Sequence, residues 1–349
     1  MPDEQEKLRQ EIEILRLRKE KETLLAQVEG KSDTTSTLGE ISAAIKAGTD
    51  VVTSTTKLVD SVDTLYRRFE GASQFKERHR TLELLVINAT KRRLIWEDAF
   101  FDSGTTFAGP LPLNVLPCKG EYAEEGAGLW AVANTSGSFL TGVSGGGKWR
   151  IEGTPFSLVI GFTNPQFGEY KTAIGIASRF ANARAGYDAA ENVHAKQYDA
   201  FGFVTRVYPD HPKLSPHRRF VYCIAESEGA VSPAKGDRIG PGQALSPGDY
   251  LLSQNGNYAL LYQSDGNLVV YSLTELRNAV WSSGTAQRNA FRCAITAAGT
   301  LSVFESEGRA VWSTPRPAPD GTLVMQDDGN LVLYTPNGQA RWDSKGFCK

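Results

Sequence analysis

Two short stretches hold the side chains of this chain that could do chemistry. They read YQSDGNLVVY (262–271) and MQDDGNLVLY (325–334), and five alternate positions are identical in both. The first set is Gln263, Asp265, Asn267, Val269 and Tyr271, and the second is Gln326, Asp328, Asn330, Val332 and Tyr334. Because alternate side chains of a β-strand point to one side, we expect each set to line one strand face. Amides, a carboxylate, a phenol and a valine supply donors, acceptors and an apolar contact, which suits an array of sugar hydroxyls.

A solvated strand face is the simpler interpretation of one such stretch, but two identical sets favour binding. A third copy, TAAGTLSVF (296–304), keeps the glycine, leucine and valine but has lost the polar set, so we expect no sugar there. A tryptophan follows each copy, at Trp281, Trp312 and Trp342. Since one repeat cannot bury its own apolar face, we expect three repeats of short strands with their tryptophans packed together.

The repeated QxDxNxVxY pattern with trailing Trp-Ser resembles the bulb-type (snowdrop-like) mannose-binding lectins over residues 240–349. The resemblance implies a β-prism of three sheets. It also implies that Asp and Asn contact O2 of mannose, Gln contacts O3, Tyr contacts O4 and Val packs on the ring carbons, at both sets of five residues. Family members often have a disulfide in the middle subdomain, whereas Cys293 has no near partner in the sequence.

Length and composition limit the remaining possibilities. A chain of 349 residues suggests two or three domains, and a net charge of −2 gives no argument for nucleic acid. Four scattered cysteines and four histidines form no catalytic or metal-ligating motif, so we expect no enzyme, metal or cofactor. The charged start MPDEQEKLRQEIE has no apolar signal segment, and no run of 18 apolar residues follows. We therefore expect synthesis in the cytoplasm and action at target membranes after release.

The N-terminal region is predicted to be helical in two parts. Residues 1–30 are highly charged and predict a short coiled coil or a helix lying on the protein. Residues 31–70 predict an amphipathic helix long enough, at about 1.5 Å per residue, to cross a bilayer core of about 30 Å. Its apolar stripe is Leu38, Ile41, Ile45, Val52, Val59, Val62, Tyr66 and Phe69. The stripe fits a core-facing or multimerisation helix as well as a membrane-inserting one.

Residues 71–230 predict an all-β sandwich, with PLPLNVLPCKG and TGVSGGGKW as loops and one helix around Tyr187–Tyr198. The order of LELLVINAT (82–90), AGLWAVAN (127–134) and FSLVIGFTNP (156–165) behind an amphipathic helix resembles the actinoporin-like pore-forming proteins. The resemblance implies that the loop after 156–165 and the following helix bind phosphocholine headgroups. The residues concerned are Thr163, Pro165, Phe167 and Tyr170 on the loop and Tyr187 and Tyr198 on the helix.

These observations predict a mainly β protein with N-terminal helices, in which an actinoporin-like sandwich precedes a lectin prism. The function expected first is a mannose-binding lectin that brings a pore-forming domain to glycan-bearing membranes, where copies of the chain assemble. The alternative is a non-lytic agglutinin or glycan sensor whose N-terminal helix multimerises it.

Overall fold

The computed structural model describes residues 78–111, 113–117, 126–135, 137, 141–192, 196–209, 217–226, 234–287, 290–306 and 308–346. Nearly all regular structure in these residues is β, and the five-residue α4 (Arg184–Asp188) is the one helix among them. The expected mainly β class is therefore confirmed for this part of the chain. The helices predicted within 1–30 and 31–70 lie outside the described residues.

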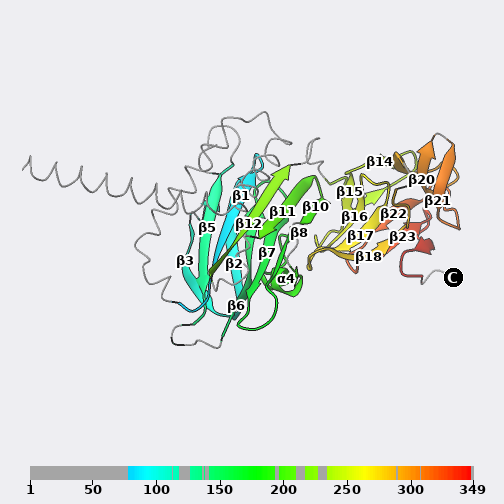
Figure 1. The fold of residues 1–349 in the computed structure, drawn as a ribbon. Helices are drawn as coiled ribbons and strands as arrows, with labels where there is room; N and C mark the ends of the chain where they lie inside the picture. The colour runs from blue at the N-terminus through cyan, green and yellow to red at the C-terminus, as the bar shows by residue number, and fades with distance from the viewer. Residues whose placement is uncertain are drawn as a thin grey trace, which may run out of the picture.

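Two six-stranded sheets face each other in the first half of the described chain, and we call this unit the sandwich (Figure 1). The first sheet runs in the order β10 (Lys196–Ala200), β11 (Phe203–Pro209), β12 (His217–Glu226), β1 (Thr81–Ala89), β5 (Ala127–Ala133) and β3 (Thr105–Leu111). The second runs in the order β4 (Asn114–Val115), β2 (Leu94–Ser103), β6 (Val143–Ile151), β7 (Phe156–Asn164), β8 (Lys171–Ser178) and β9 (Glu191–Asn192).

Strand β1 shows why the first sheet is apolar on both sides. Leu82, Leu84 and Val86 belong to the core between the two sheets, while Leu85 and Ile87 belong to a second apolar cluster with residues of β5 and β12. Successive side chains of a strand alternate between faces, so a strand buried on both faces is a nearly continuous apolar run. This explains the sequence LELLVINA. The outer cluster gives the sandwich an apolar outer face in addition to its core.

The expectation that TGVSGGGKW is a loop is wrong, because most of it forms β6 in the middle of the second sheet. A Cβ atom on Gly146 would lie 2.1 Å from the Ala183 oxygen, and one on Gly147 would lie 2.7 Å from the Trp130 ring. These glycines therefore leave room for the segment before α4 and for a core tryptophan. In PLPLNVLPCKG, β3 extends to Leu111 and Asn114–Val115 forms β4, so that expected loop is also partly strand.

The helix expected over Tyr187–Tyr198 is correct only at its start. Tyr187 lies in α4, which ends at Asp188 and has no side-chain hydrogen bond at its N-cap, Ala183. Tyr198 lies instead on β10, where it pairs with Thr205 of β11. Pairing at the sheet edge thus overrides the local preference of this segment.

Three four-stranded sheets form the second half, which we call the prism. The first sheet consists of β13 (Arg238–Ile239), β22 (Thr322–Met325), β23 (Leu331–Tyr334) and β24 (Ala340–Asp343). The second consists of β14 (Ala244–Leu245), β19 (Arg292–Ile295), β20 (Leu301–Ser306) and β21 (Arg309–Ser313). The third consists of β15 (Tyr250–Leu252), β16 (Tyr258–Tyr262), β17 (Leu268–Ser272) and β18 (Asn278–Ser282). Trp281, Trp312 and Trp342 meet edge to face, with ring centroids 5.5–5.8 Å apart. The expected packing of the three tryptophans is confirmed.

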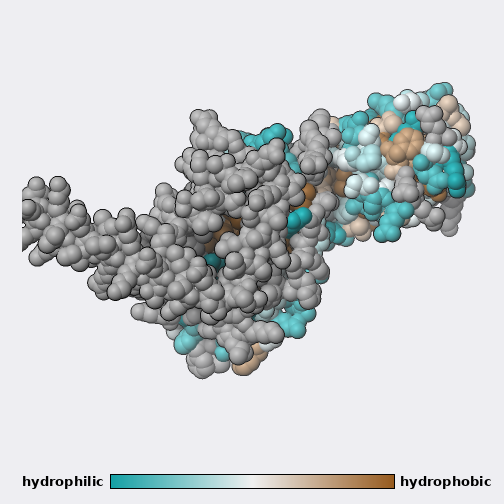
Figure 2. Space-filling view, turned by 45° about the horizontal axis from the view of Figure 1, so that its top comes forward, coloured by the Kyte–Doolittle hydropathy of each residue, from teal (hydrophilic) through white to brown (hydrophobic). Residues whose placement is uncertain are grey.

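The prism lies beside the sandwich, with β15 to β18 next to β8 and β10 (Figure 1). Tyr250 and Leu261 on the outer face of this prism sheet pack with Phe156 and Phe201 of the sandwich in one buried cluster. In Figure 2, hydrophobic residues are visible at this junction. The Ser178 amide also donates to the Leu273 oxygen at 2.7 Å. We call this contact the seam.

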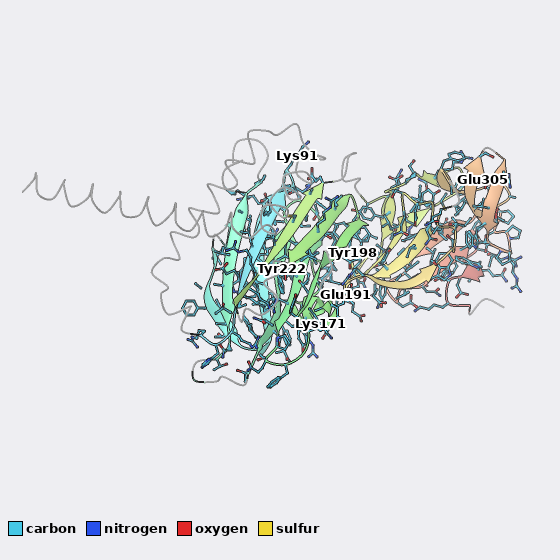
Figure 3. All side chains as sticks on the ribbon, in the orientation of Figure 1. Lys91, Lys171, Glu191, Tyr198, Tyr222 and Glu305 are labelled. Carbon is cyan, nitrogen blue, oxygen red and sulfur yellow. The ribbon has the colours of Figure 1, made fainter. Side chains whose placement is uncertain are left out.

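One polar group closes the seam at its edge. Arg277 of the prism donates to Glu191 at 2.8 Å and to the Ala189 oxygen at 2.9 Å, and its guanidinium lies 4.2 Å from the centre of the Tyr198 ring. Glu191 and Tyr198 lie on the side of the sandwich that faces the prism (Figure 3). Within the described residues, no helix is long and apolar enough to cross a membrane.

Candidate functional site

The two motifs with identical polar sets are hairpin turns, so the prediction that each lines one extended strand face is wrong. In the first, β16 ends at Tyr262 and β17 begins at Leu268. The Gln263 Nε2 atom donates to the Tyr271 hydroxyl at 2.9 Å. An extended strand would hold residues eight apart at about 26 Å. The chain instead turns at Gly266, whose φ of 85° favours glycine.

The second motif has the same construction. Gln326 donates to the Tyr334 hydroxyl at 2.8 Å, and Gly329 turns the chain with a φ of 82°. The turn brings both ends of each polar set together, and it does so at two places in the prism.

In each turn, one oxygen of the aspartate accepts a backbone amide. Asp265 Oδ1 accepts the Asn267 amide at 2.9 Å, and Asp328 Oδ1 accepts the Asn330 amide at the same distance. Both aspartates are exposed, and no hydrogen bond from a described residue uses their second oxygen. In the second turn, Lys345 Nζ lies 3.7 Å from that oxygen. Each site therefore presents a carboxylate oxygen as an acceptor.

The asparagine of each turn is oriented by residues that the sequence did not single out. Asn267 Oδ1 accepts the Ser283 hydroxyl at 3.2 Å and the Thr285 amide at 3.1 Å. Asn330 Oδ1 accepts the Ser344 hydroxyl at 3.1 Å and the Lys345 amide at 3.3 Å. With the amide oxygen engaged, Nδ2 is the group left to donate to a ligand. The serines stand two residues after a tryptophan, and this spacing is the signal that could have found them.

The five side chains thus form a compact polar site of mixed character. The asparagine and the tyrosine hydroxyl can donate, while the aspartate and the glutamine oxygen can accept. Val269 and Val332, the apolar members of the two sets, are each 3% exposed. Vicinal hydroxyls, which both donate and accept, match this arrangement.

The middle repeat has no such site. Thr296, Thr300 and Ser302 satisfy one another in a chain of hydroxyl contacts of 2.7 and 3.3 Å, and Ser302 reaches Ser313 at 2.8 Å. The position equivalent to the two tyrosines is Phe304, which Arg292 covers at 5.1 Å. Cys293 is fully buried, and burial raises the pKa of its thiol.

No protein-family model matches this chain. Known proteins that are similar to part of it are lectins. The B-type lectin plumieribetin of Scorpaena plumieri is 33% identical over 107 residues, which are 30% of this chain and 65% of that protein. Mannose-specific lectin 2 of Colocasia esculenta is 33% identical over 100 residues, 28% of this chain and 35% of that protein. A solved monomeric mannose-binding lectin of Gastrodia elata is 33% identical, with 32% of this chain matching 99% of it at a TM-score of 0.28.

About 30% of the chain is homologous to the bulb-type, snowdrop-like mannose-binding lectins. The chain spans less than two thirds of the length of the first curated relatives that it matches. The prediction of a protein that is not an enzyme agrees with these lectin relatives.

The two bulb-lectin motifs differ in their surroundings. The Tyr271 ring packs against the seam, with its centroid 6.2 Å from that of Phe201. Burial raises the pKa of Tyr271. The second motif has Lys345 as its distinguishing neighbour. The sandwich therefore touches one candidate sugar site.

The candidate lipid residues are only partly brought together. Pro165, Phe167 and Tyr170 lie on the loop between β7 and β8, and Thr163 lies at the end of β7, where its Oγ1 accepts the Lys171 amide at 2.8 Å. Phe167 is 80% exposed. The other two, Tyr187 and Tyr198, lie elsewhere.

Tyr187 packs against Phe100, with ring centroids 5.5 Å apart. Tyr198 donates to Glu191 at 3.0 Å at the seam. Both tyrosines are thus engaged within the protein, so the loop is the stronger part of this prediction. The stripe from Leu38 to Phe69 lies outside the described residues.

Proposed function

We propose that this chain is a mannose-binding lectin with two sugar sites, at residues 263–271 and 326–334. The observation that carries the proposal is the repeated geometry of the two turns, in which glutamine meets tyrosine and the asparagine oxygen is engaged in the same way. The mannose-specific relatives support the choice of sugar. A sugar whose hydroxyl groups are all equatorial lacks the axial O2 that the bulb-lectin resemblance assigns to Asp265 and Asp328.

Isothermal titration with methyl α-mannoside tests this proposal. We expect two sites per chain, and no change in that number for Thr296→Ala in the middle repeat. A stoichiometry near three, or no binding of mannosides, would contradict the assignment. Methyl β-glucoside, in which O2 is equatorial, serves as the sugar control and should bind more weakly.

We further propose that the prism brings a membrane-active sandwich to glycan-bearing membranes. One support is the apolar outer face of the first sheet, whose members are each at most 9% exposed: Leu85, Ile87, Ala89, Ala127, Leu129, Val221 and Cys223. A second is the 80% exposed Phe167 on the loop that the actinoporin-like resemblance assigns to lipid headgroups. In this proposal, the stripe of residues 38–69 moves from the protein body into the bilayer on activation.

The exchange of one apolar environment for another makes such a step feasible. Burial of apolar area stabilises by about 25 cal/mol per Å² whether the partner is a sheet or lipid. Association between copies at the membrane can then decide the balance. Two sugar sites on one chain raise the effective concentration at a glycan-bearing surface, which favours that association.

A crosslink between Val52→Cys on the stripe and Leu129→Cys on the outer face tests the pore. Dye release is measured from phosphocholine vesicles that display mannose, before and after reduction. We expect release only after reduction, with both single-cysteine variants active throughout and sugar binding unchanged. Clustering of such vesicles without any release would instead favour the alternative, a non-lytic agglutinin or glycan sensor with an N-terminal multimerisation helix.

A further inference from the structure

Arg218, on β12, is a cation with two buried donors. Its Nε and Nη1 atoms are buried, and neither has a hydrogen-bond partner among the described residues. The guanidinium carbon lies 3.8 Å from the centre of the Tyr170 ring. A cation–π contact of this kind contributes about 0.5–2 kcal/mol. It offsets only part of the cost of burying charged donors that lack acceptors.

A second arginine stands close by and is held by neutral groups. Arg80 donates from Nε to the Gln166 side chain at 2.6 Å, from Nη1 to Asn164 at 3.2 Å and from Nη2 to the Gln166 carbonyl at 3.2 Å. Burial, with the charge of Arg218, lowers the pKa of Arg80. Among the described residues, no carboxylate forms an ion pair with either arginine.

Other partly buried arginines in or next to the sandwich form ion pairs with carboxylates. Arg219, the next residue on β12, lies 2.7 Å from Glu83, and Arg277 lies 2.8 Å from Glu191. Arg150 is likewise 2.7 Å from Glu97. Among the described residues, these two neighbouring arginines therefore stand out for having no carboxylate partner, and their positive charge suits an anionic ligand.

We propose that Arg80, Arg218 and Tyr170 form a seat for a phosphate group. The planar guanidinium with five donors matches the oxygens of phosphate, and the Tyr170 ring lies against the guanidinium of Arg218. Gln166 and Tyr170 belong to the loop that also carries the exposed Phe167, so the seat lies beside an apolar side chain open to solvent. Lys171, the residue after Tyr170, marks this end of the sandwich (Figure 3).

The phosphate can come from a lipid headgroup or from solution, and the seat is the same for both. The soluble form does not depend on the proposed pore. The lipid form rests on the proposed membrane contact. It adds a preference for headgroups with a net negative charge, because no carboxylate of the described residues forms an ion pair with either arginine. Two arms of one experiment separate these cases.

The first arm measures thermal unfolding of the full chain in inorganic phosphate against chloride at equal ionic strength. Phosphate should raise the Tm of the wild type, because a ligand that binds only the folded state stabilises it. Arg218→Gln should abolish this rise, and Arg309→Gln, which changes a surface arginine paired with Glu305, should keep it. Without phosphate, the Tm of Arg218→Gln should equal or exceed that of the wild type, since an uncompensated buried charge has been removed.

The second arm measures sedimentation with sugar-free vesicles of phosphatidylcholine, with or without phosphatidic acid. Stronger binding to the acidic vesicles that is lost in Arg218→Gln assigns the seat to lipid. Equal binding, together with a phosphate-dependent Tm, assigns it to soluble phosphate. The proposed phosphate seat is wrong if phosphate does not raise the Tm of the wild type. It is also wrong if Arg218→Gln is much less stable than the wild type in the absence of phosphate. Normal phosphate binding without dye release would contradict only the pore.

Discussion

The rings of Phe201 and Tyr271 meet edge to face across the seam, with centroids 6.2 Å apart and an interplanar angle of 73°. Phe201 stands in the turn between β10 and β11, and it also stacks on Phe156 at 4.6 Å and contacts Tyr250 at 5.4 Å. Tyr271 in turn accepts the hydrogen bond of Gln263. The sandwich thus supports a side chain of the first candidate sugar site.

Replacement of this supporting ring should weaken the first sugar site alone. Phe201→Leu keeps an apolar side chain but removes the ring contacts to Phe156 and Tyr250 as well as the one to Tyr271. The Tyr271 contact, which is the one that reaches the sugar site, is an aromatic pair worth about 0.5–1.5 kcal/mol. In the background of Asp328→Asn, where only the first site binds, we expect mannoside affinity to fall about two- to tenfold. In the background of Asp265→Asn, titration should give the unchanged affinity of the second site. An equal loss in both backgrounds would contradict a local role for Phe201.

Single substitutions of the two aspartates should each remove one site without disturbing the turn. In Asp265→Asn and Asp328→Asn, the remaining Oδ1 can still accept the amide of the asparagine two residues on. The second carboxylate oxygen, which is the proposed sugar acceptor, is lost. A hydrogen bond to a charged group contributes about 1.5–3 kcal/mol, so titration should show one site in each variant and none in the double variant.

The neighbouring Asp327 provides a matched control for this experiment. It is an exposed aspartate of the same turn whose Oδ1 accepts the Asn255 amide at 2.8 Å. Asp327→Asn should keep two sites and the wild-type affinity. Loss of a site in this variant would show that general disturbance of the turn, and not the missing acceptor, explains the other results.

The sequence predicted the repeat well because its signal is periodic. Copies of one motif, each followed by a tryptophan at Trp281, Trp312 or Trp342, indicate three units that share a core, and the rings do meet. Alternation alone, however, could not show that Gln263 folds back onto Tyr271. When polar and apolar residues alternate on both sides of a single glycine, the sequence of a hairpin turn looks the same as that of a continuous strand. Only the positive φ of Gly266 distinguishes the turn from the strand.

Tertiary contacts account for the other errors. The run Ser144–Lys148 has the composition of a loop, yet its glycines lie within a sheet, where the segment before α4 and the Trp130 ring approach them closely. The seam was also outside the reach of sequence reasoning. Leu261 and Tyr250 belong to the outward face of their own sheet, and nothing in their local pattern shows that Phe156 and Phe201 cover them.

The contact of α4 with β7 should be sensitive to a single methyl group. A Cβ atom on Gly161 would lie 1.8 Å from the Gly186 oxygen, so α4 cannot stay in place in Gly161→Ala. Overpacking of this kind costs about 1–3 kcal/mol or more. Urea unfolding should show at least this loss. Gly175→Ala on the adjacent strand is the control, since its Cβ would meet only the flexible end of Leu276 at 3.2 Å and should be tolerated.

Alkaline pH should weaken the seam. Burial raises the pKa of Tyr198 to about 12, with Glu191 acting in the same direction and Arg277 against it, and burial raises that of Tyr250 to about 12 as well. In the unfolded chain, both phenols titrate near pH 10. A raised pKa means that the folded state holds its protons more tightly. This stabilisation is therefore complete below pH 10 and is lost as the pH rises toward 12.

Tyr198→Phe isolates one part of this alkaline effect. The variant keeps an aromatic ring under Arg277 but has no hydroxyl to donate to Glu191 and no proton to lose. Urea unfolding midpoints measured at several values between about pH 8 and pH 12 should fall less steeply above pH 10 in the variant than in the wild type, because only the wild type loses the Tyr198 contribution. The variant should be the less stable protein below pH 10, where the hydrogen bond is intact. Parallel curves for the two proteins across this range would show that Tyr198 titrates in the folded protein as it does in the unfolded chain, and that its place at the seam does not protect its proton.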